Sequence, residues 1–175
     1  VPNAGLTTNI GATHLEFFGS EEKVFEEEGY LYHAVKDVTH GEGFYLINKD
    51  DQFLKRFEPF KGAVTYGEGS DVAARISYLE NGAQIVFKGH NLVATNAHIT
   101  GRHNKLNLIT CAFIAHHFFP ESRVEILAAA AEFRPTKNRS EWIEFESRPV
   151  YLDAYNANPS SMKAALEGFK ESVLE

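Results

Sequence analysis

The spacing of hydrophobic residues changes several times along the chain, and each change marks a predicted element. Residues 44–48 form an apolar run that ends in polar side chains, which is typical of a buried strand. Two β-rich runs flank Asn81-Gly82, a pair suited to a tight turn, so residues 74–89 predict a hairpin. Further strands are predicted over residues 91–99, as a third antiparallel strand, and over residues 141–155, as two short strands with a turn near Ser147.

The first helix is predicted to begin after Ser20, a residue type that caps helices well. Glu21 and Glu22 then occupy the first turn, where negative charge is favourable at the positive end of the helix dipole. Residues at helical spacing form one apolar stripe on this helix, namely Val24, Leu31 and Val35.

Three more helices are predicted in the second half of the chain. One runs from about Asn104 to Phe119, is apolar nearly all round and should therefore be largely buried. The next covers residues 123–133 and begins with a capping box made by Ser122 and Glu125. The last helix starts after Asn158-Pro159 and carries one apolar face, made of Met162, Ala165, Leu166, Phe169 and Val173.

Alternating strands and helices with one antiparallel insert predict an α/β fold. Open α/β sheets bind ligands where strands turn into helices. Two such turns are rich in polar side chains, residues 9–14 and residues 153–158. These turns are the first places in which to expect a binding site.

Composition narrows the function classes further. The 175 residues carry a formal net charge of −7 and no Lys/Arg run, which argues against a nucleic-acid partner. Cys111 is the only cysteine, lies among apolar residues and is predicted to be a small buried hydrophobe. No apolar run approaches 18 residues and no signal peptide is evident, so we expect a cytoplasmic protein with no membrane partner.

Capping explains only part of the polar turn over residues 153–158. Asn158 accounts for a helix cap, but Asp153, Tyr155 and Asn156 have no such explanation. Arg139, in the preceding loop, has no obvious acidic neighbour; it is either an ordinary surface arginine or a phosphate ligand.

Two asparagines lie three residues apart on the long helix and therefore share one face. Asn104 can act as a cap, whereas Asn107 lies deeper and has no capping role. Two amides on one helix face suit a flat heterocycle that has donor and acceptor edges.

Two groups in the first helical region are ambiguous. His14, with Asn9 and Glu16 on the same turn, is either a metal ligand or general base, or a hydrogen-bonded structural residue. Glu28 shares the inward stripe with Val24 and Leu31. Because an unpaired buried carboxylate costs several kcal/mol, either the stripe is half-buried there or Glu28 has a cation.

Four stretches together resemble the Mur ligase family: TNIGATHLEFFGS, GRHNKLN, RPTKNRS and DAYNANPSSMKAALE. They occur in the family's order and span essentially the whole chain, with Thr13 replacing the usual alanine. The resemblance is strongest to the branch that joins D-alanyl-D-alanine to UDP-N-acetylmuramoyl-tripeptide. It implies an ATP- and Mg²⁺-dependent ligase of cytoplasmic peptidoglycan synthesis, acting through an acyl phosphate.

The resemblance also implies roles for individual residues. Asn104 and Asn107 would contact adenine, Asp153 the ribose hydroxyls and Arg139 the terminal phosphate. The remaining implied site residues are Tyr155 and Asn156, which would line the same nucleotide site, and His14, which would bind magnesium.

The chain departs from the family pattern at the metal site. Glu28 falls where the family has a carbamylated lysine, and Tyr30 falls where an acid is usual. Glu28 already carries a carboxylate, so it could replace the carbamate; alternatively, the metal site has decayed.

The chain also lacks the phosphate-binding loop G-T-x-G-K-[ST] and the upstream metal-binding glutamate of the family. We therefore interpret residues 1–149 as the second half of a central ATPase domain and residues 150–175 as the start of the C-terminal domain. Such a fragment should bind ATP weakly and be inactive alone. The alternatives are a related ligase of the folylpolyglutamate or cyanophycin synthetase type, disfavoured by residues 155–159, or a non-catalytic binding descendant.

Overall fold

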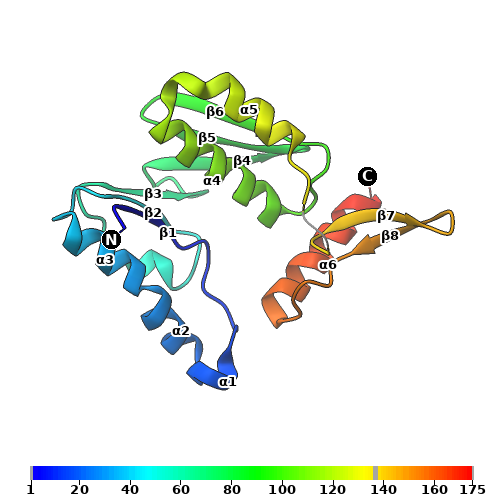
Figure 1. Cartoon of the computed structure of the whole chain (residues 1–175), viewed down its shortest axis with the longest axis horizontal. Coiled ribbons are helices and arrows are strands. Elements are labelled where there is room, and N and C mark those ends of the chain that lie inside the picture. Colours follow the sequence, from blue (N-terminus) through cyan, green and yellow to red (C-terminus); the bar gives the residue numbers. More distant parts are fainter. Residues whose placement is uncertain (1, 136–137, 175) are drawn as a thin grey trace. The chain divides into compact units, whose positions relative to one another are not determined.

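A computed structural model describes residues 2–135 and 138–174 of the chain. The fold is α/β, with hydrogen-bonded strand order β1-β2-β3-β4-β5-β6 and a separate pair β7-β8 (Figure 1). Contacts divide the chain into two units, residues 1–76 with 86–90, and residues 77–85 with 91–175. The predicted α/β fold class is therefore confirmed.

Unit 1 is built on parallel strands. β1 (Ala4–Leu6) pairs with β2 (Phe44–Asn48), which pairs with β3 (Ala63–Gly67), and β3 pairs with the first residues of β4 (Ala74–Leu79). All five residues of β2 are buried, as its continuous apolar pattern predicts. The carboxyl ends of these parallel strands consequently share one edge.

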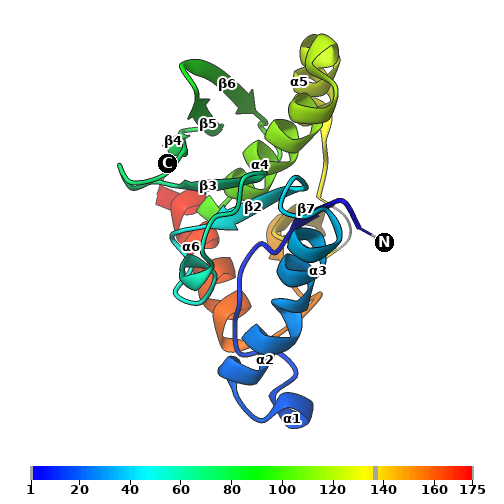
Figure 2. The same ribbon diagram turned by 90° about the vertical axis from the view of Figure 1, so that its left-hand side faces the viewer.

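The predicted first helix is interrupted. α1 (Leu15–Phe18), α2 (Glu21–Glu28) and α3 (Tyr30–Val38) follow one another along unit 1 (Figure 2). The Ser20 cap is confirmed, because its Oγ accepts a hydrogen bond of 3.3 Å from the Lys23 backbone. At Gly29 the helix packs so closely on Phe57 that a Cβ would lie 3.0 Å from that ring. Gly29 keeps a right-handed helical backbone, with a φ of −67° and a ψ of −16°, and separates α2 from α3.

The structure corrects the prediction that Glu28 lies on the inward stripe. Val24 and Val35 are buried as predicted, but Glu28 is exposed to solvent. Its carboxylate therefore carries no burial cost that a bound cation would have to offset.

Aromatic packing forms the core of unit 1. The Tyr32 and Phe57 rings stack with centroids 4.2 Å apart, and Tyr45 meets Tyr32 edge-on at 5.4 Å. Burial raises the pKa of both Tyr32 and Tyr45. These contacts fix α3 and the 3₁₀ turn Leu54–Arg56 on the strands.

The predicted hairpins are present, with one shift. β5 (Gly82–Phe87) follows β4 after a two-residue turn at Glu80-Asn81, and β6 (His90–Thr95) follows β5. This turn lies one residue before the Asn81-Gly82 pair that the sequence predicts. Gly82 instead belongs to the strand, where a Cβ would come within 2.1 Å of the Ala94 carbonyl oxygen, so glycine serves close strand packing.

The long helix α4 (Arg102–Phe118) confirms the predicted element, but not its burial. Leu108, Ile109 and Phe113 are buried, whereas Asn107 and Cys111 are exposed on another face. The prediction of a buried Cys111 is therefore wrong, because hydrophobic periodicity does not show whether a neighbouring element covers that face.

α5 (Arg123–Glu132) follows a 3₁₀ turn over Pro120–Ser122. The predicted capping box is absent, since the Ser122 side chain makes no cap hydrogen bond. The 3₁₀ turn gives Ser122 a φ of −92° and a ψ of 28°, away from the extended conformation of a cap residue.

The C-terminal elements are a hairpin and a helix. β7 (Glu141–Phe145) and β8 (Arg148–Leu152) pair antiparallel around the predicted turn near Ser147. α6 (Pro159–Leu174) begins as predicted: Asn158 Oδ1 accepts the Ser161 backbone N–H at 2.8 Å. Within the described part of the chain, no helix is long and apolar enough to span a bilayer.

Candidate functional site

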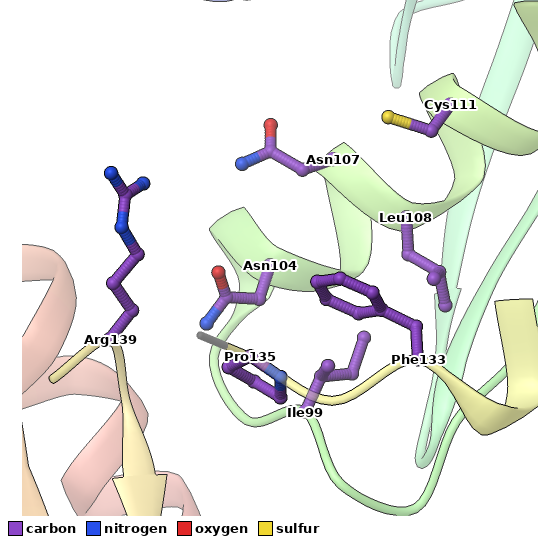
Figure 3. A pocket seen from close by; sticks show the side chains of 8 residues that line it. All are labelled: Ile99, Asn104, Asn107, Leu108, Cys111, Phe133, Pro135 and Arg139. Carbon is purple, nitrogen blue, oxygen red and sulfur yellow. The ribbon is translucent and has the colours of Figure 1, made fainter. Parts of the chain in front are cut away.

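A cavity of ≈ 250 Å³ in unit 2 collects three of the predicted site residues. Figure 3 shows that the side chains of Asn104 and Asn107 project from α4 toward the side on which Arg139 lies. The remaining walls are apolar or weakly polar: Ile99, Leu108, Cys111, Phe133 and Pro135. An apolar slot with a few polar groups at one side is the usual form of a small-molecule site.

The two asparagine amides are in different states. Asn104 Nδ2 donates a hydrogen bond of 2.9 Å to the Thr100 carbonyl, which anchors the amide at the start of α4. Its Oδ1 has no hydrogen bond within the described residues and remains available as an acceptor. Asn107 is exposed, and its amide bonds no residue in the described ranges, so it keeps both donor and acceptor capacity for a ligand.

Arg139 lies on a loop with an unusual backbone. Its neighbours Asn138 and Ser140 both have left-handed φ values, 67° and 47°. The Asn138 carbonyl accepts backbone hydrogen bonds from Ala154, at 3.0 Å, and Tyr155, at 3.1 Å. These bonds join the arginine loop to the polar turn after β8. The sequence alone did not show that these two segments are in contact.

Asp153 completes this connection. Its Oδ2 accepts hydrogen bonds from the Ser140 backbone, at 3.1 Å, and from the Ser140 hydroxyl, at 2.7 Å. Ser140 is buried, with 3% of its surface exposed. One carboxylate oxygen therefore holds the arginine loop, and Oδ1 has no bond within residues 2–135 and 138–174.

Tyr155 is the aromatic partner of Arg139. The guanidinium carbon lies 3.7 Å from the centroid of the Tyr155 ring, a cation–π contact at a largely exposed position. Asn156 is different: its Oδ1 accepts the Ala157 N–H at 2.9 Å and stabilises the turn. Asp153, Tyr155 and Asn156 are not among the cavity's lining residues.

His103, in the first turn of α4, is half-buried. Burial lowers its pKa, while the charge of Asp153 opposes the shift. A neutral imidazole near pH 7 is therefore favoured beside the start of α4. Gly101 precedes it with a φ of 79°, and a Cβ on Gly168 of α6 would lie 3.2 Å from Gly101 Cα, so both positions favour glycine.

A second polar cluster lies at the carboxyl edge of the unit 1 strands. Asn48 Nδ2 donates to the Thr8 carbonyl at 3.0 Å, and Asp51 Oδ2 accepts the Ile10 N–H at 3.0 Å. These side chains fix the turn over residues 9–14. The cluster follows the rule for parallel sheets, because β1 and β2 both end there.

His14 and Glu28 belong to unit 1, and both are exposed. His14 has a φ of 54° and precedes α1 as its cap residue, without a side-chain cap bond. Among the residues that the structure describes, no three His, Cys, Asp or Glu side chains form a group that could hold a metal. A magnesium site made by these two residues would therefore need phosphate oxygens or water as further ligands.

Sequence reasoning missed the residues that hold the site in shape. Asn96 is buried and donates 2.7 Å hydrogen bonds to the carbonyls of Ala130 and Phe133, which places the Phe133 wall. Ser140 holds Asp153. The position of Asn96 at the end of a β-rich run is a weak signal of a structural role. Its partners could not be identified from the sequence, because they lie more than 30 residues away along the chain.

Comparison with known proteins defines the class to which this α/β fold and amide-lined cavity belong. The family model described as the Mur ligase middle domain matches residues 1–115. The chain therefore belongs to the Mur ligase family.

Several curated relatives are similar over nearly the whole chain. A UDP-N-acetylmuramoyl-tripeptide--D-alanyl-D-alanine ligase of Rickettsia prowazekii is 30% identical over 189 residues, covering 97% of this chain and 39% of the relative. The enzyme of that name from Bacillus subtilis is 29% identical, covering 99% and 38%. A UDP-N-acetylmuramate--L-alanine ligase of Desulforamulus reducens is 26% identical, covering 98% and 38%. The chain thus spans well under half the length of these relatives.

Solved structures share the fold. MurF from Acinetobacter baumannii superposes with a TM-score of 0.75 at 22% identity, over 97% of this chain and 38% of that one. MurF ligase from Thermotoga maritima in complex with ADP gives a TM-score of 0.75 at 18% identity, over 97% and 39%. The resemblance deduced from the four motifs is confirmed at the level of the family.

Proposed function

We propose that this chain is part of an ATP-dependent ligase that joins D-alanyl-D-alanine to UDP-N-acetylmuramoyl-tripeptide through an acyl phosphate. The observation that supports it best is the connected arrangement of Arg139, Ser140, Asp153 and Tyr155 beside the amide-lined cavity. A base-sized slot next to a guanidinium and a carboxylate provides partners for the base, phosphate and ribose of a nucleotide.

In this proposal, the site residues bind different parts of the nucleotide. Asn104 and Asn107 bind the donor and acceptor edge of adenine, and Phe133 and Pro135 bound the slot. Arg139 binds the terminal phosphate from its place over the Tyr155 ring. Asp153 accepts the ribose hydroxyls with the oxygen that Ser140 leaves free, and Asn156 shapes the turn that carries Tyr155.

Magnesium fits this proposal only in part. His14 and Glu28 are both exposed, and each would contribute one side-chain group as a ligand. Mg²⁺ is commonly held by one or two protein groups together with phosphate oxygens and water, so two ligands suffice in principle. When bound, the ion would neutralise charge that develops on the transferred phosphoryl group.

The domain boundary near residue 150 and a cytoplasmic location are part of the same proposal. Residues 150–175 would be the first strand and helix of the C-terminal ligase domain. The Asp153–Asn158 turn would then serve both as a hinge and as a nucleotide contact.

Relatives with other substrates make the substrate the first thing to test. The full-length product of the gene should release phosphate from ATP when given UDP-N-acetylmuramoyl-tripeptide and D-alanyl-D-alanine. The same assay with UDP-N-acetylmuramate and L-alanine is the matched control, since relatives of that name are similar to the chain. Turnover of the second pair but not the first would overturn the proposed substrate.

A non-catalytic descendant is the second candidate, favoured by Glu28 at the position of the carbamylated lysine. It predicts that ADP binds while no substrate pair supports phosphate release. Nucleotide binding without turnover, in a product that contains a phosphate-binding loop, would therefore favour this second candidate.

A further inference from the structure

An apolar hollow continues from the amide-lined cavity. It measures ≈ 280 Å³ and is lined from α4 and from α5 and its C-terminal end; we call it the α4–α5 groove. All its lining side chains are apolar except for one thiol: Leu108, Cys111, Ala112, Ala115, Ile126, Ala129, Ala130 and Phe133. Such a surface offers no group for a charged ligand and suits an apolar one.

The groove exists because small residues face each other. Four of its eight lining residues are alanines, two from α4 and two from α5. Helices packed with larger side chains would interdigitate and fill this space. The alanine run over residues 128–131 thus has a structural consequence that its helix propensity alone does not explain.

The groove and the amide-lined cavity share three walls, Leu108, Cys111 and Phe133. Asn104, Asn107 and Cys111 follow one another at helical spacing along α4, and the line continues to Ala115. The groove therefore begins one helical turn beyond the Asn107 amide, and a ligand in the cavity has a continuous apolar path into it.

The chemistry of Asn107 indicates which part of a ligand reaches the groove. An asparagine amide pairs with adenine through the N6 and N7 edge, donating to N7 and accepting from N6. This step rests on the proposed function. An adenine bound in this way has its N6 nitrogen beside Asn107, at the end of the cavity next to Cys111, and its second N6 hydrogen is free for substitution.

We propose that the α4–α5 groove is a subsite for an apolar substituent on N6 of a bound adenine nucleotide. An N6-alkyl or N6-aryl adenine nucleotide keeps one N6–H for the Asn107 amide and places its substituent among alanine and leucine side chains. The ligand class is defined by this combination of a purine edge and an apolar group. Binding of the substituent removes apolar surface from water without leaving a polar group unpaired.

The test compares ADP with N6-benzyl-ADP by calorimetry on the full-length gene product. The readout is the ratio of the two Kd values in the wild type and in two variants. Ala129→Leu fills the groove, because Ala129 lines it but not the amide-lined cavity. Ala128→Leu is the matched control, an exposed neighbour on α5 that lines neither space.

We expect N6-benzyl-ADP to bind about tenfold more tightly than ADP in the wild type and in Ala128→Leu. In Ala129→Leu the ratio should fall to about one. A ratio near one in the wild type, or a tenfold ratio that survives Ala129→Leu, would overturn the subsite. If ADP itself does not bind the wild type, the proposed nucleotide site fails first, so the two failures are distinguishable.

Discussion

The Ser140 hydroxyl lies 2.7 Å from Asp153 Oδ2 and donates a hydrogen bond to it, although the two residues are 13 positions apart. The Ser140 backbone N–H donates to the same oxygen at 3.1 Å. One carboxylate thus holds the loop that carries Arg139, while its other oxygen remains for a ligand. Under the proposed function, Asp153 would accordingly link the position of Arg139, as the phosphate ligand, to the position of the ribose.

Substitution of Ser140 tests this link. Ser140→Ala removes the charge-assisted bond but keeps the backbone bond, so we expect a loss of about 1.5 kcal/mol of unfolding free energy. ADP should bind more weakly because the Arg139 loop is less firmly held. Denaturant unfolding and calorimetry measure the two effects. Ser70→Ala, at an exposed position in unit 1, should change neither, and an unchanged ADP affinity in Ser140→Ala would contradict the link.

The sequence predicted those parts of the site that depend on local pattern. The helix bearing Asn104 and Asn107, the Asn158 cap and the hairpin near Ser147 follow from periodicity and turn chemistry. The Ser140–Asp153 bond could not be predicted, because a serine hydroxyl has many possible partners and only the folded chain selects one. The exposure of Glu28 could not be predicted either, because helical spacing does not show which part of a stripe the rest of the fold covers.

Two asparagines of the polar turn should differ in how much they stabilise the protein. Asn158 Oδ1 accepts the Ser161 N–H and the Ser160 hydroxyl, whereas Asn156 Oδ1 accepts only the adjacent Ala157 N–H. Asn158→Ala should therefore destabilise the protein by about 1 kcal/mol, and Asn156→Ala should have a smaller effect. Thermal unfolding compares the two variants. Equal losses would show that the cap of α6 does not dominate the stability of this turn.

Cys111 offers a direct probe of the cavity, because it is the only cysteine and lines both the cavity and the α4–α5 groove. The residue is exposed to solvent, but neighbouring protein atoms partly desolvate the thiol and thereby raise its pKa. Alkylation at pH 8 should therefore be slower than that of a free thiol and should accelerate at higher pH. Mass spectrometry of the iodoacetamide adduct gives the rate.

The same pKa shift has a consequence for stability. A raised thiol pKa means that the unfolded chain loses its proton first as the pH increases. Stability should thus be unaffected by Cys111 below the ordinary thiol pKa and should decline as the pH rises from there to the raised pKa of the folded state.

The rate of Cys111 alkylation also reports on ligand binding. Saturating ADP should slow the alkylation of Cys111 further, while pyrophosphate, which lacks a base, should not. Equal protection by both ligands would place the base elsewhere.

Substitution of Glu28 tests whether the metal site of the family persists in this chain with a glutamate in place of the carbamylated lysine. If its carboxylate replaces the carbamylated lysine, Glu28→Gln in the full-length enzyme should raise the Mg²⁺ concentration needed for half-maximal turnover by about tenfold or more, since a charged ligand is lost. Glu27→Gln is the control, because Glu27 is also exposed and lies on the same helix.

The two variants distinguish a metal ligand from a surface carboxylate. Because Glu28 is exposed, neither substitution should lower the unfolding temperature, so a change in Mg²⁺ dependence can be assigned to the site rather than to folding. Glu28→Lys restores the side chain that the family carbamylates, and bicarbonate should then stimulate its turnover. Identical magnesium titrations for the wild type, Glu28→Gln and Glu27→Gln would mean that Glu28 does not bind the metal, and the exposed end of α2 would have no role in catalysis.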